Sequence, residues 1–190
     1  MDLSVPGRQI VILTGAPGTG KTTTCGELLR SARELGLDCA GILCPARVDD
    51  RVKVGIDVVD ARTLQRRRLA DVDELPGRLR AGPYRFDEAA VAWGVARLGA
   101  ACPCDVLIVD EIGPMEMDRR EGWVNALDIL RVGDYRVAVA VVRPSLVDVV
   151  RSAVEVRGTV LVRGCVVPGL GVVHEVLSLV GLAPAPAREQ

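Results

Sequence analysis

The chain has 190 residues, enough for one domain with a well-buried core. Its formal net charge is −1, so no strong overall field favours binding to nucleic acid or to a membrane surface. Hydrophobic residues make up 49% of the chain and aromatic residues only 3%, a composition that suits a parallel sheet of Val and Ile covered by helices.

Six cysteines and the N-terminal sequence bear on the cellular compartment. The apolar run near the N-terminus is too short for a secretory signal, and no segment reaches the ~18 apolar residues that a membrane span requires. We therefore expect a cytoplasmic protein whose cysteines are free thiols and mostly small core residues. Cys102-Pro103-Cys104 lacks the second clustered pair that a metal site of this kind would need.

A glycine-rich loop between an expected strand and an expected helix is the first strong pattern in the chain. Residues 9–13 predict a strand, and residues 21–35 have the apolar spacing of a helix that ends at Gly36. Between them lies the pattern G-x-x-x-x-G-K-T, which a chain with only two lysines rarely produces by chance.

The chemistry of such a loop is specific, because its backbone N–H groups turn inward and cradle phosphates at a helix N-terminus. Its glycines allow backbone angles and a closeness to the ligand that a Cβ would prevent. The lysine reaches the β- and γ-phosphates, and the hydroxyl that follows it can bind Mg²⁺. We expect Mg²⁺ as cofactor, Thr22 among its ligands, Lys21 as a catalytic cation, and a nucleotide held by Gly15, Ala16, Pro17, Gly18, Thr19, Gly20, Lys21, Thr22 and Thr23.

An insertion at about residues 47–82 interrupts the strand–helix rhythm. Residues 51–60 alternate polar and apolar side chains, the period of an antiparallel strand with one solvated face. Residues 66–70 are its expected partner, joined to it by residues 61–65. The remainder up to Gly82 is polar, contains Pro76 and Gly77, and predicts a loop.

The rest of the chain alternates expected strands and helices. Asp87 and Ser145 are suitable N-caps for two of the helices. This alternation predicts an α/β fold with a mainly parallel sheet and helices on both faces, in one domain over residues 1–183 with a disordered tail over 184–190. We expect further strands at 39–43, 106–109, 137–142 and 159–162, and helices at 88–98, 121–130, 145–153 and 172–180.

Two acidic residues follow the apolar strand 106–109. In open α/β sheets ligands lie at the carboxyl ends of the strands, so Asp110 and Glu111 should lie near the glycine-rich loop. Four apolar residues and an Asp form a Walker B pattern, and we predict that Asp110 helps to hold Mg²⁺, which keeps much of its water shell. Glu111 would then orient and partly deprotonate the attacking water.

An arginine could neutralise the transferring phosphoryl group, a contribution of about 10³–10⁵ in rate. Four arginines lie in or near expected loops: Arg47, Arg62, Arg66 and Arg143. Of these, Arg47 and Arg143 follow or end expected strands, where they would face the nucleotide.

Several runs occur in the order found in one known family. They are Gly15-Ala16-Pro17-Gly18-Thr19-Gly20-Lys21-Thr22-Thr23, Gly41-Ile42, Val54-Gly55-Ile56-Asp57-Val58-Val59-Asp60, Gly82-Pro83-Tyr84 and Asp110-Glu111-Ile112-Gly113-Pro114-Met115-Glu116. In these runs the chain resembles the small P-loop nucleoside-triphosphatases, which include the cancer-related nucleoside-triphosphatase and its prokaryotic thermophile-type relatives. The resemblance covers roughly residues 9–165, and its last run is the most discriminating.

The resemblance implies a RecA-like P-loop fold and Mg²⁺-dependent hydrolysis of ATP, GTP and other nucleoside triphosphates to diphosphate and phosphate. It also implies broad base tolerance and slow turnover. The matching positions would be Lys21 and Thr22 on phosphate and metal, Asp110 as the Walker B residue and Glu111 as the catalytic carboxylate.

The chain also departs from the family pattern. Pro45-Ala46-Arg47 replaces a Glu-Val-Arg run but keeps its arginine, so we predict Arg47 as the catalytic arginine. Gly55-Ile56 replaces Gly-Phe, and Arg163-Gly164 stands where an Asn-Arg pair is expected. These changes bear on base contacts and rate more than on the phosphate site.

Hydrolysis with nucleoside triphosphates as substrates is the leading hypothesis, and two alternatives stay open. A nucleoside or nucleotide kinase would use the same loop, with Arg66-Arg67-Arg68 in an arginine-rich lid. A nucleotide-gated binding protein would use residues 47–82 as its interaction surface. The sequence predicts no membrane contact and no clear nucleic-acid surface, and it does not identify a protein partner.

Overall fold

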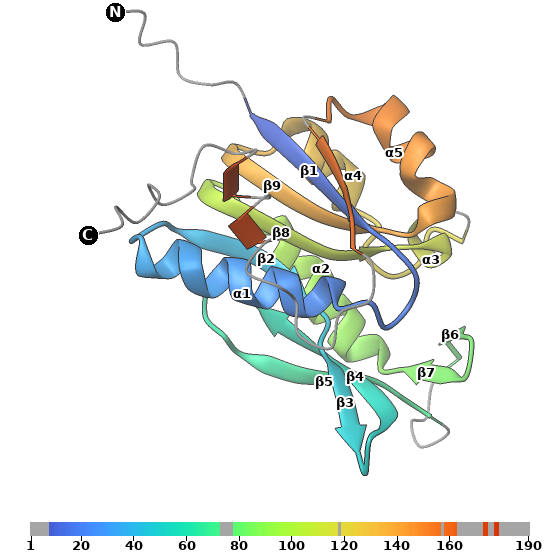
Figure 1. Cartoon of the computed structure of the whole chain (residues 1–190). Coiled ribbons are helices and arrows are strands. Elements are labelled where there is room, and N and C mark those ends of the chain that lie inside the picture. The colour runs from blue at the N-terminus through green and yellow to red at the C-terminus, as the bar shows by residue number, and fades with distance from the viewer. Residues whose placement is uncertain are drawn as a thin grey trace, which may run out of the picture.

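The structure, a computed structural model, describes residues 8–72, 78–117, 119–156, 158–162, 173–174 and 177–178 (Figure 1). In chain order its elements are β1 (Gln9–Thr14), α1 (Lys21–Glu34), β2 (Cys39–Leu43), β3 (Ala46–Asp49), β4 (Val52–Asp60), β5 (Arg66–Val72), β6 (Arg80–Ala81), β7 (Tyr84–Phe86), α2 (Glu88–Gly99), β8 (Cys104–Ile112), α3 (Pro114–Met117), α4 (Ala126–Val132), β9 (Tyr135–Val142), a 3₁₀ turn (Pro144–Leu146), α5 (Val147–Ala153) and β10 (Gly158–Leu161).

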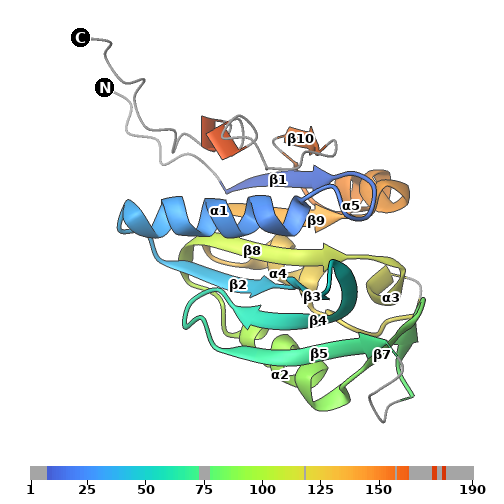
Figure 2. The ribbon, with the colours of Figure 1, turned by 60° about the horizontal axis from the view of Figure 1, so that its bottom comes forward.

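All the described strands belong to one sheet, in the order β10-β1-β9-β8-β2-β4-β5-β7-β6, with β3 paired to β4. The pairings among β10, β1, β9, β8 and β2 are parallel, whereas those among β2, β4, β5, β7, β6 and β3 are antiparallel. Figure 2 shows β8, β2, β4 and β5 following one another across the sheet. The expected hairpin is therefore an antiparallel extension of the same sheet, and only half of the sheet is parallel.

Both faces of the parallel half are buried, as the near-continuous apolar strands require. In β1, Ile10 and Ile12 pack into one core and Val11 and Leu13 into the other, following the period of two along a strand. The first core includes residues of α2, α4 and α5, and the second includes residues of α1. Helices on both faces are therefore confirmed.

Helix α1 follows directly from the glycine-rich loop. It buries Cys25, Leu28, Leu29 and Ala32, which lie at the spacing i, i+3, i+4, i+7 of one helix face. This face packs on β2, β8 and β9 and so fixes the start of the helix at the carboxyl edge of the sheet. Figure 1 shows α1 running beside β2 with its first turn beside the loop from β1.

Helix α2 begins as the sequence predicts. Oδ1 of Asp87 accepts hydrogen bonds from the backbone N–H groups of Ala89 and Ala90 at 2.8 and 3.0 Å, which satisfies two of the free donors of the first turn. The other predicted cap is wrong, because Ser145 lies inside the 3₁₀ turn and α5 starts after it with no side-chain cap.

Several expected boundaries are also wrong. The strand expected at 106–109 runs on through Asp110 and Glu111 to Ile112, and the expected loop before Gly82 contains β6. The helix expected at 121–130 begins only at Ala126, because Gly122 has a φ of +69° and Trp123 is turned into the core.

The solvated face expected for residues 51–60 occurs only at the start of β4, far from the turn at residues 61–65 that joins it to β5. Val52 and Lys53 are exposed, but all residues from Asp57 to Asp60 in β4 are buried. Val58 joins the core on the α2 side and Val59 the core on the α1 side, so the end of β4 next to this turn is covered on both faces.

Some predictions fall wholly or partly outside the described residues. The tail at 184–190 and Cys165 lie outside them, and of the helix expected at 172–180 the structure describes only Val173, His174, Leu177 and Ser178, all helical. In the described part of the chain Cys25 and Cys39 are buried, and five free cysteines are present: Cys25, Cys39, Cys44, Cys102 and Cys104.

Candidate functional site

The carboxyl ends of β1, β2, β8 and β9 meet at one edge of the sheet, as parallel pairing requires. A cavity of about 950 Å³, here called the first cavity, opens at this edge. It lies between the glycine-rich loop with the start of α1 and the ends of β2, β4, β8 and β9. Its lining includes Pro17, Gly18, Gly20, Lys21, Thr22, Thr23, Cys44, Arg66, Asp110, Glu111 and Arg143.

Two glycines of the loop meet requirements of the backbone, a positive φ at Gly20 and a close approach of another segment at Gly15. Gly20 has a φ of +94° at the N-cap of α1, a conformation that side-chain-bearing residues rarely adopt. A Cβ on Gly15 would collide with the carbonyl oxygen of Val162, so the loop leaves β1 pressed against the chain beyond β10. Of the nine residues that the sequence assigned to nucleotide binding, Gly15, Ala16 and Thr19 do not line the first cavity.

Lys21 is held in place by the loop itself. Its ammonium Nζ donates hydrogen bonds to the carbonyl oxygens of Gly15 and Ala16 at 3.0 and 2.9 Å, and the residue is buried. Burial lowers the pKa of this ammonium, and the nearby Arg143 lowers it further, while Glu111 and Asp110 oppose the shift. A cation with its alkyl chain packed and its head fixed is thereby presented at the edge of the first cavity.

Asp110 is the most buried carboxylate of the site, with 1% of its surface exposed. Its Oδ2 accepts a hydrogen bond from the backbone N–H of Cys44 at 3.0 Å, and the Thr22 side chain also hydrogen-bonds to it. Burial raises the pKa of Asp110 to about 6, against the stabilising effect of these two donors. A carboxylate kept dry in this way is costly unless a cation compensates it.

Glu111 lies beside Asp110 and pairs with a cation from the next strand. Its Oε1 accepts a hydrogen bond from Nε of Arg143, which follows β9. Both side chains remain partly exposed and both line the first cavity. The structure thus places Lys21, Thr22, Asp110, Glu111 and Arg143 around one space.

The arginine that the sequence favoured points elsewhere. Arg47 forms an ion pair with the buried carboxylate of Asp71, with Nη1 at 2.9 Å from Oδ1, and it does not line the first cavity. Arg66 does line it, at the far end along β5, and pairs with Asp57 at 3.4 Å. The geometry therefore does not support Arg47 as the arginine of this site, and it brings Arg143 there instead.

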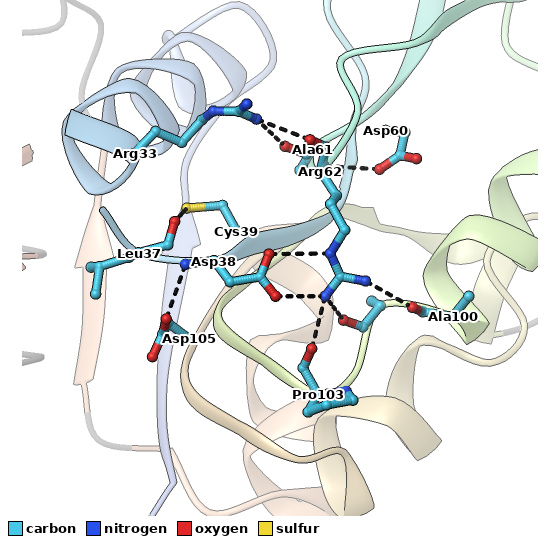
Figure 3. Close-up of polar contacts among 11 residues, drawn as sticks. Arg33, Leu37, Asp38, Cys39, Asp60, Ala61, Arg62, Ala100, Pro103 and Asp105 are labelled. Atoms are coloured by element: carbon cyan, nitrogen blue, oxygen red, sulfur yellow. Dashed lines mark hydrogen bonds and ion pairs between the residues drawn. The ribbon is translucent and has the colours of Figure 1, made fainter. Parts of the chain in front are cut away.

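Arg62, the remaining arginine of the four, does not line the first cavity and binds other parts of the chain (Figure 3). Its guanidinium pairs with the carboxylate of Asp38 and donates to the carbonyl oxygens of Ala100, Ala101 and Pro103 at 3.2, 2.8 and 2.7 Å. These residues lie around the turn after β4, the end of α2 and the start of β8. Arg62 ties these three segments together at the edge of the sheet opposite the first cavity.

Neither Cys44 nor the bond between Thr22 and Asp110 could be selected from the sequence. The contribution of Cys44 is a backbone N–H, which carries no side-chain pattern, and it follows from the parallel pairing of β2 with β8. Tyr84 and Gly113–Glu116 also lie near the site, although the sequence offered them only as part of a resemblance.

The fold and the site together define a class of protein: an α/β protein in which a glycine-rich loop and an acidic strand end lie at the same edge of the sheet. A sequence profile described as NTPase matches residues 10–163, most of the chain, so the chain belongs to the NTPase family. Among the described residues, no helix has the length and apolar character needed to cross a membrane.

The curated relatives include proteins named nucleoside-triphosphatase THEP1. The chain is 34% identical over 139 residues to the nucleoside-triphosphatase THEP1 of Methanothermobacter thermautotrophicus, covering 72% of this chain and 78% of that protein. It is 33% identical over 109 residues to THEP1 of Caldivirga maquilingensis, covering 57% and 61%. With this and some other curated relatives the match spans only about three fifths of their length.

A solved structure agrees with the fold. The solution structure of a human cancer-related nucleoside triphosphatase superposes with a TM-score of 0.66, covering 93% of this chain and all of that one. At 20% sequence identity this likeness concerns the fold alone.

Proposed function

We propose that the protein is a RecA-like P-loop enzyme that hydrolyses nucleoside 5′-triphosphates to the diphosphate and phosphate with Mg²⁺. The observation that carries this proposal is the meeting of Lys21, Thr22, Asp110 and Glu111 around the first cavity, at the start of α1. A glycine-rich loop at a helix N-terminus binds phosphates. The side chains of these four residues match the roles that phosphoryl transfer requires. The relatives carry the name nucleoside-triphosphatase, which supports the same reaction.

The residues present fit a magnesium ion. Thr22 and Asp110 offer only oxygen atoms, the ligands that Mg²⁺ prefers, and Asp110 is a buried carboxylate in need of a cation. In the described part of the chain no three His, Cys, Asp or Glu side chains cluster as a metal cage. Mg²⁺ in nucleotide sites takes one or two protein ligands and completes its shell with phosphates and water, so two ligands suffice. When bound, the ion would neutralise charge on the β- and γ-phosphates.

The protein's own residues do the rest. Backbone N–H groups of the glycine-rich loop hold the β-phosphate, and the Lys21 ammonium moves from the carbonyls of Gly15 and Ala16 to the β- and γ-phosphates. The γ-phosphate draws the guanidinium of Arg143 away from Glu111. The freed carboxylate of Glu111 then orients the attacking water and takes its proton.

The substrate range we propose is broad, covering ATP, GTP and other nucleoside triphosphates. The contacts described above all go to the triphosphate, which every nucleoside triphosphate shares. They give no preference for one base over another.

Phosphate release from ATP, GTP, CTP and UTP, measured with and without Mg²⁺, tests the proposal. We expect release that requires Mg²⁺ and varies little with the base. In the variant Glu111→Gln, kcat should fall by about 10²-fold or more, because a positioned base contributes that much, while the affinity for a non-hydrolysable triphosphate persists. Glu34→Gln on the exposed side of α1 is the matched control and should leave kcat unchanged. Unaltered phosphate release in Glu111→Gln would reject Glu111 as the base.

A further inference from the structure

A second cavity of about 820 Å³ adjoins the first on the other side of Glu111. No residue of the glycine-rich loop or of α1 lines it. Its walls come instead from the turn after β8 with α3, the end of β9, the first half of β4, the hairpin of β6 and β7, and α2. The space is therefore formed largely by the antiparallel extension and by the segments that cover it.

The second cavity is walled mainly by apolar and aromatic side chains: Ile56, Leu69, Tyr84, Phe86, Met115 and Trp123. This chain has few aromatic residues, two Trp, two Tyr and one Phe, and three of these five line this space. Trp123 is fixed there, because a Cβ on Gly94 of α2 would collide with its indole ring. The carboxylate of Glu116 accepts hydrogen bonds from the backbone N–H groups of Gly113 and Trp123 at 2.8 and 3.2 Å and so holds this wall in place.

The two cavities share a boundary made of Cys44, Lys53, Ile56, Tyr84, Glu111 and Arg143. The ion pair of Glu111 with Arg143 lies on this boundary, so the proposed base faces the triphosphate from one cavity and an acceptor from the other. Lys53 lies over the ring of Tyr84, with its ammonium 4.9 Å from the ring centroid, and adds a donor at the same boundary.

Hydrolysis has no use for such a space, because water needs neither volume nor aromatic walls. Cavities of about 300–1,000 Å³ with apolar and aromatic walls and a few polar groups are typical of small-molecule sites. We propose that the second cavity binds an alcohol with a flat heteroaromatic body, of the size of a nucleoside, and that this alcohol accepts the γ-phosphoryl group in place of water. This inference rests on the proposed triphosphate site and extends it from hydrolysis to transfer.

The transfer step balances without any further reactant. The acceptor oxygen forms a bond to the γ-phosphorus, and the bond from that phosphorus to the β–γ bridging oxygen breaks. The electron pair of the broken bond stays on the nucleoside diphosphate. The hydroxyl proton passes to the carboxylate of Glu111 and from there to solvent. The products are a phosphomonoester of the alcohol and a nucleoside diphosphate.

Phosphorus NMR on the full chain with Mg·ATP and a panel of ribonucleosides and deoxyribonucleosides tests the proposal. We expect a phosphomonoester signal with at least one nucleoside, and a matching loss of inorganic phosphate. Binding is measured separately by the fluorescence of Trp123 in the variant Trp93→Phe, which removes the other tryptophan; Trp93 stacks with Arg67 and does not line the second cavity.

A pair of variants locates the effect. Val91→Trp, from α2, fills the second cavity and should lower the ratio of phosphomonoester to phosphate by about tenfold or more, the effect of ~1.4 kcal/mol of lost acceptor binding. Val149→Trp on the exposed side of α5 adds the same side chain at a residue that does not line the cavity and should leave the ratio unchanged. The circular dichroism of both variants checks that they fold.

The outcomes separate the two proposals. Phosphate release with no phosphomonoester from any nucleoside overturns the acceptor pocket and leaves hydrolysis standing, whether or not the fluorescence changes. Equal ratios in Val91→Trp and in the unchanged protein also overturn it, because transfer would then occur elsewhere. Neither phosphate nor phosphomonoester would overturn the triphosphate site, and the acceptor pocket with it.

Discussion

Nε of Arg143 donates a hydrogen bond to Oε1 of Glu111, which joins the ends of β9 and β8 at the boundary between the two cavities. The cation and the acid that the proposed reaction needs are therefore held together at this boundary. Arg47, at a similar place in the sequence relative to its strand, is instead engaged by Asp71.

Comparison of Arg143→Ala with Arg47→Ala tests this assignment. An arginine that neutralises the transferring phosphoryl group contributes about 10³–10⁵ in rate, so kcat for phosphate release should fall by about that factor in Arg143→Ala. Arg47→Ala should keep kcat and lose stability, because the buried carboxylate of Asp71 loses one of its two arginine partners. The reverse pattern, with Arg47 essential and Arg143 dispensable, would restore the prediction from sequence.

Asp110→Asn should make the protein more stable at neutral pH in the absence of metal. Burial raises the pKa of Asp110 to about 6, so between about pH 4 and 6 the folded chain holds a proton that the unfolded chain has lost. The free energy of unfolding therefore falls as the pH rises through this window, and the loss stays constant above it. Asn cannot ionise and escapes this loss, which amounts to roughly 3 kcal/mol for a pKa raised by about two units.

Urea unfolding of both proteins with EDTA, from pH 4 to pH 8, measures this effect. The advantage of Asp110→Asn should be largest above pH 6 and vanish near pH 4, while its phosphate release is lost at every pH. A stability difference that does not change with pH would show that Asp110 carries no such shift.

Arg62→Ala should lower stability without changing turnover. The guanidinium donates to three backbone carbonyls and pairs with Asp38, and bonds of this kind to a partly exposed charged group contribute about 1–2 kcal/mol together. The control is Arg30→Ala, which removes an exposed pair with Glu34 and should cost less than about 0.5 kcal/mol. Equal midpoints of urea unfolding for the two variants would contradict the role of Arg62 drawn in Figure 3.

The parts of the fold that the sequence predicted depend on neighbouring residues. The strand before the glycine-rich loop, the helix after it and the cap at Asp87 follow from spacing and side-chain chemistry within a few positions. The hairpin of β4 and β5 also follows, because its two strands are joined by only five residues. The sequence did not show that this hairpin would add to the edge at β2, since that pairing joins distant segments.

The choice among arginines shows where sequence reasoning stops. Arg47 and Arg143 both follow or end strands expected from the sequence, and no local pattern separates them. What separates them is the pairing of Arg47 with Asp71, which lies two strands further on, and the position of β9 next to β8. The aromatic wall of the second cavity was missed for the same reason, because Tyr84 of β7 and Trp123 before α4 come from distant segments that line one cavity only in the folded chain.

Replacement of the loop lysine tests the central claim most directly. Lys21→Ala removes the ammonium that we expect on the β- and γ-phosphates, and the loss of one such charge costs on the order of 10²–10³ in kcat. Titration with a fluorescent non-hydrolysable triphosphate, followed by phosphate release from ATP, should show weakened binding and turnover reduced by at least that factor in a variant that folds as the unchanged protein does. Binding and phosphate release equal to those of the unchanged protein would contradict the account.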